Sequence, residues 1–457
     1  MIEAIKKIFS VSDLRSKIVF TLLMLVLCRV GAVIPVPGIN VEAALTLFKQ
    51  ASGGGQNLFQ LMDIFSGGAF ARMTVIALGV MPYISASIVM QLLVAVIPSF
   101  QREIKENREA GQKKIAKWTR IGTMGLSLFQ AFLFAKYAVW INESNPGIIL
   151  HHLIAVRMFD VPLLFYITVM LTMTTGTVFL MWIGEQITAK GIGNGVSLII
   201  TIGILSSLPG IIGSIIQQLN LSSQDVGQLT FSSLIVLCAV FIVIIIGTIL
   251  VIQGQRKIPL QYARRVISKS GEVQGGNSYI PLKINYAGVI PVIFASSFLM
   301  FPATIGQWLG SSSIVGRIVN MLTPGNWLYT LLYIFLILFF TFFWTSTQFN
   351  PDQIASDMKK NGAFIPGIRQ GKPTKDYLES TMGRITLIGG IFLAIIAILP
   401  MLVSKLMGID PRISYFFGGT SLLILVGVIL DTSKQIESHL IMKRYDGFMK
   451  RGKLLDR

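Results

Sequence analysis

Apolar residues gather in ten runs along the chain, each long enough to cross a lipid bilayer. A helix rises ~1.5 Å per residue, so crossing the ~30 Å hydrocarbon core takes ~20 residues. Runs of this length, separated by polar and turn-forming residues, predict an all-α polytopic membrane protein with ten transmembrane helices. The predicted spans are 18–37, 79–97, 121–140, 161–183, 193–216, 230–252, 287–308, 327–347, 385–403 and 413–430.

The segment before the second span has a different pattern. Residues 64–78 are apolar and rich in small side chains, but they include Arg72 and join the next run without a connecting loop. This segment is too short to cross the membrane, so we expect a re-entrant half-helix over 64–75. Irregular backbone is tolerated at membrane depth only where protein or a water-filled cavity surrounds it. We therefore expect the half-helix to fold into the protein.

The composition agrees with a membrane protein. Hydrophobic residues make up 53% of the 457 residues and charged residues 13%, against ~25% in soluble domains. The mean hydropathy is +0.69. These values exclude a soluble globular protein, a disordered protein and a small disulfide-linked scaffold.

The net charge of +18 is unevenly distributed. Of the 39 Lys and Arg residues, 31 lie in alternate segments between the spans, 6 lie on the opposite side, and Arg29 and Lys136 fall within spans. Because basic loops stay on the cytoplasmic side, both termini are predicted to be cytoplasmic. A full span at 64–78 would turn the later basic loops outward, which favours the half-helix.

Ten spans divide into two halves of five. Because five is odd, the second half would be inverted relative to the first, around a central pore. Pro82 in span 2 and Pro291 in span 7 are corresponding breaks that favour such a repeat, with two unrelated proline kinks as the alternative. The predicted organisation is a cytoplasmic segment 1–17, an N-terminal half 18–216, an external hinge connection 217–229, a C-terminal half 230–432 and a basic cytoplasmic tail 433–457.

The spans offer little polar chemistry. No Asp or Glu lies within a predicted span, although ion-coupled transporters usually keep acidic residues at membrane depth. No catalytic Ser–His, paired-Asp or zinc pattern lies there either, so we predict no catalytic residue, no metal and no cofactor. These residues alone leave a channel and a secondary transporter of small solutes nearly equal. An intramembrane enzyme and an insertion scaffold without a pore are weaker alternatives.

Two cytoplasmic loops, 253–286 and 348–384, are long and contain Pro, Gly and aromatic residues, so we expect them to project as folded structures. The general cytoplasmic excess of basic residues explains their charge but not their length. Their basic residues suit an anionic partner such as RNA phosphate, an acidic protein or a lipid headgroup. The candidate docking residues are Arg256, Lys257, Arg264, Arg265, Lys359, Lys360 and Arg369.

Several long motifs resemble the SecY family, the channel subunits of the bacterial Sec protein translocon. The resemblance covers about residues 12–445, with the motifs in the family's order. The motifs are FSGGAFARMTVIALGVMPYISASIVMQLL (65–93), MWIGEQITAKGIGNGVSLII (181–200), INYAGVIPVIFASS (284–297), NPDQIASDMKKNGAFIPGIRQG (350–371) and YFFGGTSLLILV (415–426).

The resemblance implies an hourglass-shaped pore that is not an enzyme. Unfolded secretory polypeptides would cross it, and transmembrane segments would leave sideways into lipid. The implied constriction ring is Val80, Ile84, Ile200, Ile293 and Ile424, with Val80 where Ile is often found. The implied plug spans about 63–74 and includes Asp63, Phe65, Ser66, Gly67, Gly68, Ala69 and Arg72. The implied lateral gate, between spans 2 and 7, includes Ser85, Ser87, Ile88, Ile290, Phe294 and Ser297.

The resemblance also implies a location and partners. The location is the bacterial plasma membrane, that is, the inner membrane. The partners are SecE and SecG subunits, the SecA motor, the ribosome, signal peptides, nascent polypeptides and anionic membrane lipid. A homodimer is left open.

Overall fold

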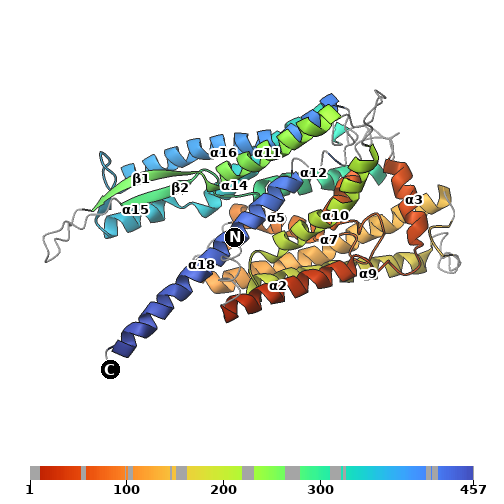
Figure 1. Ribbon diagram of the computed structural model, residues 1–457, viewed down its shortest axis with the longest axis horizontal. Helices are drawn as coiled ribbons and strands as arrows, with labels where there is room; N and C mark the ends of the chain where they lie inside the picture. Colours follow the sequence, from red (N-terminus) through yellow and green to blue (C-terminus); the bar gives the residue numbers. More distant parts are fainter. Residues whose placement is uncertain are drawn as a thin grey trace.

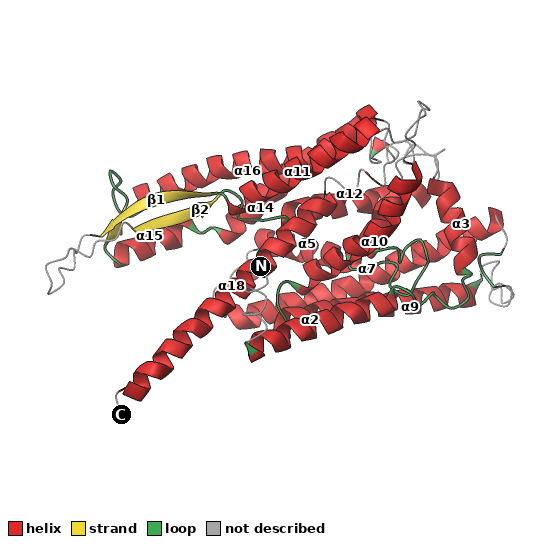
Figure 2. Cartoon of the chain, viewed as in Figure 1, coloured by secondary structure: helices red, strands yellow, loops and turns green. Residues whose placement is uncertain are grey.

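The computed structural model of the chain describes residues 11–52, 58–97, 99–100, 107–144, 147–150, 162–218, 231–262, 278–308, 321–322, 326–407, 413 and 420–455. These residues form an almost entirely helical protein with one small sheet, as Figures 1 and 2 show. The class predicted from the hydrophobic runs is therefore confirmed.

A helix lies at each predicted span. The N-terminal half contains α2 (Ser12–Gly31), α5 (Met81–Val96), α7 (Arg108–Ser144), α9 (Leu163–Lys190) and α10 (Gly195–Gln218). The C-terminal half contains α11 (Phe231–Gln253), α12 (Ile290–Trp308), α14 (Trp327–Gln348), α16 (Lys372–Met407) and α18 (Thr420–Leu455). Within the described residues, 6 helices are long and apolar enough to cross a membrane, in α7, α9, α10, α11, α14 and α16.

Three helices extend well beyond their predicted spans. Helices α7 and α16 begin before the apolar run, and α18 continues after it. Hydropathy marks only the part of a helix that lies in lipid. The extensions are rich in Lys, Glu, Gln and Arg, which are good helix formers and continue a helix into water.

The two prolines do not interrupt spans 2 and 7, so that prediction is wrong. Pro82 is the second residue of α5 and Pro291 is the second residue of α12. A proline in the first turn removes an N–H that has no partner within the helix, so it starts a helix without a kink. Neither Pro82 nor Pro291 therefore breaks its helix.

The predicted half-helix over 64–75 is also wrong in its extent. The helix here is α4 (Leu58–Ser66), and turns follow it up to residue 80. Gly67 and Gly68 end the helix with φ angles of 69° and 84°, in the left-handed region that favours glycine. The turns are fixed to the segment after α2, because Val36 N donates to Met73 O at 3.0 Å. Another short helix, α3 (Val41–Ser52), was not predicted.

The two long basic loops fold together into a projecting lobe. Strands β1 (Gln255–Tyr262), β2 (Ser278–Lys283) and β3 (Ala363–Phe364) form an antiparallel sheet in the order β2-β1-β3, with α15 (Pro351–Lys360) beside it. Ile258 and Leu282 are at most 2% exposed and pack with Met358 and Leu378. In Figure 1 this lobe extends beyond the helices at one end. The prediction of folded loops is confirmed for the described residues, although the sheet itself was not predicted.

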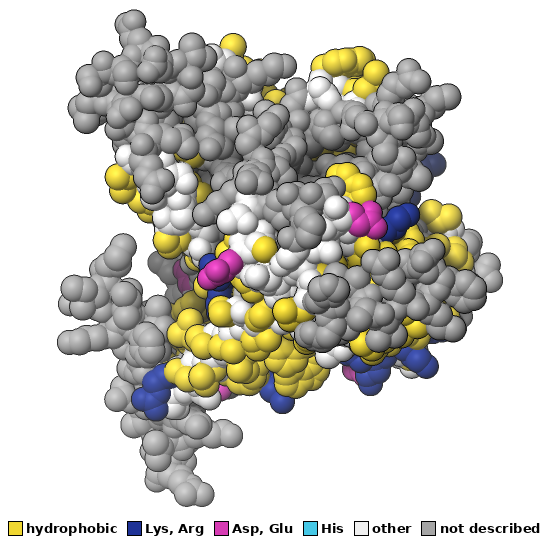
Figure 3. Space-filling model, turned by 90° about the vertical axis from the view of Figure 1, so that its right-hand side faces the viewer, with side chains coloured by type: hydrophobic (Ala, Val, Ile, Leu, Met, Phe, Trp, Pro, Cys, Tyr) yellow, Lys and Arg dark blue, Asp and Glu magenta, His cyan; other side chains and the backbone are white. Residues whose placement is uncertain are grey.

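The two halves lie side by side and meet through two helix pairs. Helix α5 packs against α12, and α10 packs against α18, with the largest buried cluster between them. On the outer faces large apolar side chains are exposed, such as Leu22, Leu23 and Val26 of α2. Exposed apolar stripes of this kind suit lipid rather than water. Figure 3 views the end opposite the lobe and shows few charged side chains among the described residues.

Candidate pore, plug and seam

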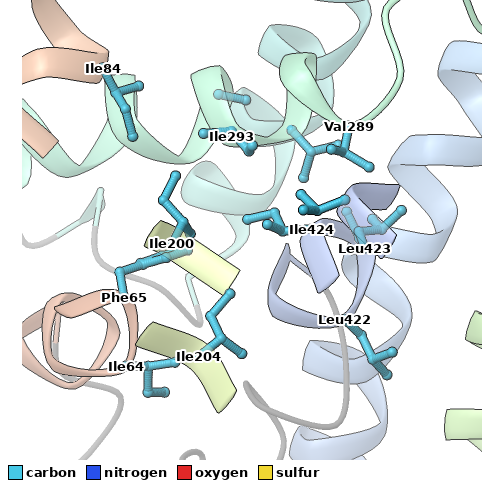
Figure 4. Packing of buried hydrophobic residues seen from close by; sticks show 14 of the residues in the cluster. Ile64, Phe65, Ile84, Ile200, Ile204, Val289, Ile293, Leu422, Leu423 and Ile424 are labelled. Carbon is cyan, nitrogen blue, oxygen red and sulfur yellow. The ribbon is translucent and has the colours of Figure 1, made fainter. Parts of the chain in front are cut away.

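The centre of the molecule is closed by aliphatic side chains from four helices. Ile84 of α5, Ile200 of α10, Ile293 of α12 and Ile424 of α18 are each at most 7% exposed and belong to one cluster, together with Val80 just before α5. In Figure 4, Ile293 and Ile424 point toward each other across the centre, and Ile200 lies nearby. The structure therefore brings all five predicted ring residues into one apolar core.

The end of α4 and the turns after it pack against this core. Ile64, Phe65 and Ala69 belong to the same buried cluster, and Figure 4 shows Phe65 beside Ile200. A cavity between Phe65, Val80 and Ile200 has a volume of only about 10 Å³. Holding one water molecule takes ~10–15 Å³, so side chains fill almost all of the space between the aliphatic core and Phe65.

Hydrogen bonds within the predicted plug keep it compact. Asp63 Oδ1 accepts from Ala71 N at 2.8 Å, and Ser66 Oγ accepts from Phe70 N at 3.0 Å. Thr74 Oγ1 donates to Ala69 O at 3.2 Å. These bonds satisfy polar groups inside the segment, so it can keep its shape if it moves as a unit. Arg72 is exposed and takes no part in the core.

A cavity of about 620 Å³ lies on the other side of the aliphatic core. Ile84, Ile200 and Ile293 form its apolar end. Arg120 and Glu185 line its polar wall. The distribution of basic residues predicts that this cavity faces the cytoplasm.

The polar wall is fixed by an ion pair between α7 and α9. Arg120 Nε and Nη2 each donate to a carboxylate oxygen of Glu185 at 2.8 Å. The two side chains are 55% and 27% exposed, so solvent screens the pair and its contribution to stability is small. Because the charges of Arg120 and Glu185 are opposite, this wall of the cavity holds charged groups that together carry no net charge.

The contact between α5 and α12 is mainly apolar and forms a seam into the cavity. Ser87, Ile290 and Phe294 line the cavity beside it. Across the seam, Ser297 Oγ donates to Met81 Sδ at 3.8 Å, a weak bond because a thioether is a poor acceptor. Two other predicted gate residues, Ser85 and Ile88, also lie on α5, and Ile88 is buried in the central cluster.

Aromatic packing supports the α12 side of the seam. The Phe294 ring meets the rings of Phe340 and Trp344 on α14 edge to face, with centroids 5.8 Å apart in each case. Such pairs add ~0.5–1.5 kcal/mol beyond the burial of their surface. Helices α12 and α14 can therefore move as one unit.

The projecting lobe presents the predicted docking residues to solvent. Arg256 and Lys257 lie on β1, Lys359 and Lys360 end α15, and Arg369 lies in the turn after β3, all of them exposed. Arg264 and Arg265 lie outside the described residues. The described apolar side chains of the lobe form a buried cluster of their own.

Two bonds hold the parts of this lobe in place. Asn350 caps α15 by accepting from Gln353 N at 3.2 Å, and Lys375 Nζ of α16 lies 2.8 Å from Asp352 Oδ1. The hydrogen bond with Asp352 raises the pKa of Lys375. Lys257 Nζ lies 4.8 Å from the centre of the Tyr279 ring, a cation–π contact between β1 and β2.

Comparison with known proteins identifies the family. A family model described as SecY matches residues 74–433. The chain belongs to the SecY family. A protein translocase subunit SecY from Chlamydia trachomatis is 58% identical over 448 residues, which cover 98% of each chain. Family membership makes this chain a membrane subunit of a protein translocase rather than an enzyme, as predicted.

Solved SecY-like structures share the fold. A structure described as that of a protein-conducting channel has a TM-score of 0.60 and 19% identity, covering 92% of this chain and 91% of the other. Another structure is described by the role of the SecY plug domain in stabilising the closed channel and maintaining a membrane seal. It has a TM-score of 0.58 and 21% identity, with the same coverage. These likenesses support the helical architecture.

Some residues that line the cavity of about 620 Å³ were not predicted from the sequence. Arg120 and Glu185 each lie near the end of a predicted span, but 65 positions separate them and no local pattern marks the pair. Gln91 and Trp344 also line the cavity and were missed, because each reads as an ordinary residue of an apolar helix. Among the described residues, no group of three or more His, Cys, Asp and Glu is arranged to hold a metal ion.

Proposed function

We propose that this chain is the channel subunit of a bacterial Sec translocon. It passes unfolded secretory polypeptides across the plasma membrane and releases transmembrane segments laterally into lipid. The observation that carries this proposal is the arrangement of the centre: a cavity of about 620 Å³ ends at a closed aliphatic core, and a compact segment packs against that core. A secondary transporter of small solutes has no comparable support.

In this proposal, Val80, Ile84, Ile200, Ile293 and Ile424 form the constriction ring. Branched aliphatic side chains exclude water and ions by packing and dewetting when the channel is idle. They offer a moving polypeptide no hydrogen bond, so chains of many sequences can pass. The plug, residues 63–74, fills the space beyond the ring.

The lateral gate is the seam between α5 and α12, which includes Ser85, Ser87, Ile88, Ile290, Phe294 and Ser297. Apolar packing and one weak hydrogen bond close it, so parting these helices leaves no charge facing lipid. Signal peptides and transmembrane segments would bind in the opened seam. The two halves, 18–216 and 230–432, would part as inverted repeats. The predicted hinge connection 217–229 lies, from residue 219 on, outside the described residues.

The projecting lobe docks the partners that drive transport. Its exposed basic residues, including Arg369, suit the acidic surface of a SecA motor or the phosphates of ribosomal RNA. The chain assembles with SecE and SecG subunits, and its cytoplasmic basic residues also suit anionic lipid. Both termini face the cytoplasm, and α18 continues through most of the tail 433–457, as far as Leu455. Purification of the complex also tests whether two copies pair as a homodimer.

Reconstituted transport tests the proposal. The full chain, purified with the subunits that accompany it, is placed in liposomes and given SecA, ATP and an unfolded secretory precursor. We expect the precursor to become protected from added protease only with SecA and ATP. Uptake of small solutes without protection of any precursor would favour the transporter instead.

A further inference from the structure

Arg29 places a positive charge inside the first membrane helix and beside the predicted plug. Its Nη1 donates to Ser206 Oγ of α10 at 2.7 Å and to the carbonyl oxygen of Gly67 at 3.4 Å. The Ser206 hydroxyl can donate in turn to the Gly67 carbonyl at 3.2 Å or to Gly203 O at 2.8 Å. Three separate segments, α2, the turn after α4 and α10, therefore meet in one polar cluster, here called the Arg29 cluster: Arg29, Gly67 and Ser206.

The location of this charge calls for an explanation. A guanidinium at membrane depth is costly and is usually retained for function. Arg29 meets its neighbours through Nη1, whereas its Nε is buried without a hydrogen-bond partner. A polar group buried without a partner costs free energy. Arg29 lies in the last turn of α2, where a cation interacts favourably with the helix dipole, but its hydrogen bonds lead to other segments and not to this helix.

Two glycines allow the close approach that these bonds need. Gly67 has a φ of 69°, and a Cβ added to it would collide with the Arg29 guanidinium and the Ser206 hydroxyl. A Cβ added to Gly203 on α10 would collide with the carbonyl of Phe65 in the plug. The backbone of the plug thus lies against α10 in a fit that side chains on either side would prevent.

We propose that Arg29 is a positioning residue for the plug, and that the Arg29 cluster is a latch that holds residues 63–74 against α10 while the channel is idle. This inference rests on the proposed function and deepens it. The latch consists of one short and one long hydrogen bond from a single cation, so it biases the plug toward the closed position without fixing it. A polypeptide that enters the ring displaces the plug, and water in the opened pore then solvates both the guanidinium and the freed carbonyl.

The test compares Arg29→Gln with Lys136→Gln in the full chain purified with its accompanying subunits. Lys136 is exposed on α7, so its replacement removes an equal charge from a span without touching the plug. The first readout is resting ion conductance in planar bilayers. The second is the rate at which a small thiol reagent modifies Ser66→Cys, a buried plug position, in a background without Cys28 and Cys238.

We expect Arg29→Gln to raise both readouts about tenfold, the usual weight of a hydrogen bond to a charged group. Lys136→Gln should change neither, and Arg29→Lys should restore part of the closure. In a Ser206→Ala background the added effect of Arg29→Gln should shrink, because the two residues act through one cluster.

A second pair of variants separates the latch from general damage to the turn. Gly67→Ala and Gly68→Ala impose the same backbone strain, since both glycines have a positive φ, but a Cβ at Gly68 meets nothing within 4 Å. Because the strain is common to both variants, Gly67→Ala should raise the resting ion conductance more than Gly68→Ala does. If Arg29→Gln does not fold, this pair decides the question.

Three results would overturn the latch. One is a folded Arg29→Gln protein with unchanged conductance and unchanged thiol modification. Another is an equal effect of Gly67→Ala and Gly68→Ala. Deletion of residues 63–74 serves as the reference. If the deletion variant conducts ions at rest but Arg29→Gln does not, the proposed channel function is kept and the latch is rejected. If even the deletion conducts no ions, the proposed function fails, and the latch fails with it.

Discussion

At the scale of residues, the centre of the molecule combines an apolar ring with a single nearby cation. The ring residues come from four helices and are all buried, whereas Arg29 lies against the plug beside them. The two parts do different work. In the proposed channel, aliphatic packing excludes water from the pore, and the hydrogen bonds of Arg29 bias the plug toward its closed position.

Replacing Ile84 and Ile293 together with Ser should raise ion leakage through the idle channel. Two hydroxyl groups would wet a constriction that stays dry because it offers water no partner. Single-channel recording in planar bilayers measures the effect. The matched control is Ile235→Ser with Ile242→Ser on α11, where both side chains are exposed on the outer face. Equal conductance in the two double variants would locate the seal elsewhere.

Replacing Arg369 with Glu should impair SecA-driven or ribosome-coupled transport and leave the fold intact. An exposed charge changes the free energy of unfolding by under ~0.5 kcal/mol in most cases, so the loss should come from docking. Precursor protection and thermal unfolding of the same preparation separate the two effects. Lys372→Glu, an exposed basic residue at the start of α16, is the control. A fall in stability with transport retained would assign Arg369 a structural role.

The sequence predicted some of these residues and not others, for a physical reason. The ring residues lie in long contiguous motifs, so a family resemblance carries them position by position. The contacts of Arg29 are not marked in this way: Gly67 lies in one of these motifs but 38 positions from Arg29, and Ser206 is 177 positions away and outside them. Contacts of this kind depend on how three segments pack, and no local pattern encodes them.

At the scale of elements, the seam depends on two helices that start in the same way. Helices α5 and α12 each carry a proline in the first turn and continue past it. Helix α12 also holds Pro302 in its interior, which removes one N–H from the helix. The described contact between α5 and α12, at Ile290, Phe294 and Ser297, lies before Pro302, so it can open without unfolding either helix. The first-turn prolines mark where the two helices begin.

A disulfide across this seam should hold the gate shut. The side chains of Met81 and Ser297 are in contact, so Met81→Cys with Ser297→Cys, in a background without Cys28 and Cys238, should crosslink in the idle channel. The short crosslink should block both precursor transport and insertion of membrane segments, and reducing agent should restore them. A long flexible crosslinker at the same pair should be tolerated. Normal rates with a fully formed disulfide would mean that the seam is not the gate.

Hydropathy predicted a helix at each of these places in the chain, but not the ends of the helices or the structure between them. It reports transfer into lipid, so it is silent where α7, α16 and α18 continue into water. The half-helix was misplaced because the small residues at 67–75 are apolar, although Gly67 and Gly68 adopt a conformation that ends a helix. The sheet of the lobe depends on pairing between β1 and β3, which lie in different loops.

At the scale of the whole molecule, the two long basic loops fold into a lobe at one end of the helices (Figure 1). By the positive-inside rule, the sequence predicts that this lobe and the cavity face the cytoplasm.

Labelling in intact cells tests this orientation. Thr46→Cys on α3 and Asp357→Cys on α15 are exposed positions on the two predicted sides. An impermeant thiol reagent should label the first in intact cells and the second only after lysis. Labelling of both positions from the same side would contradict the ten-span topology. Both cysteine variants are made in a background from which Cys28 and Cys238 have been removed.

The central claim is that a polypeptide passes between the four helices that carry the aliphatic core. The most direct measurement is photo-crosslinking to a precursor arrested in transit, with the photoreactive residue placed in turn at Ile84, Ile200, Ile293 and Ile424. We predict crosslinks to the precursor from all four positions and none from Leu23 or Leu250, which are exposed on the outer faces of α2 and α11. Crosslinks from the outer positions, with none from the four isoleucines, would contradict the account.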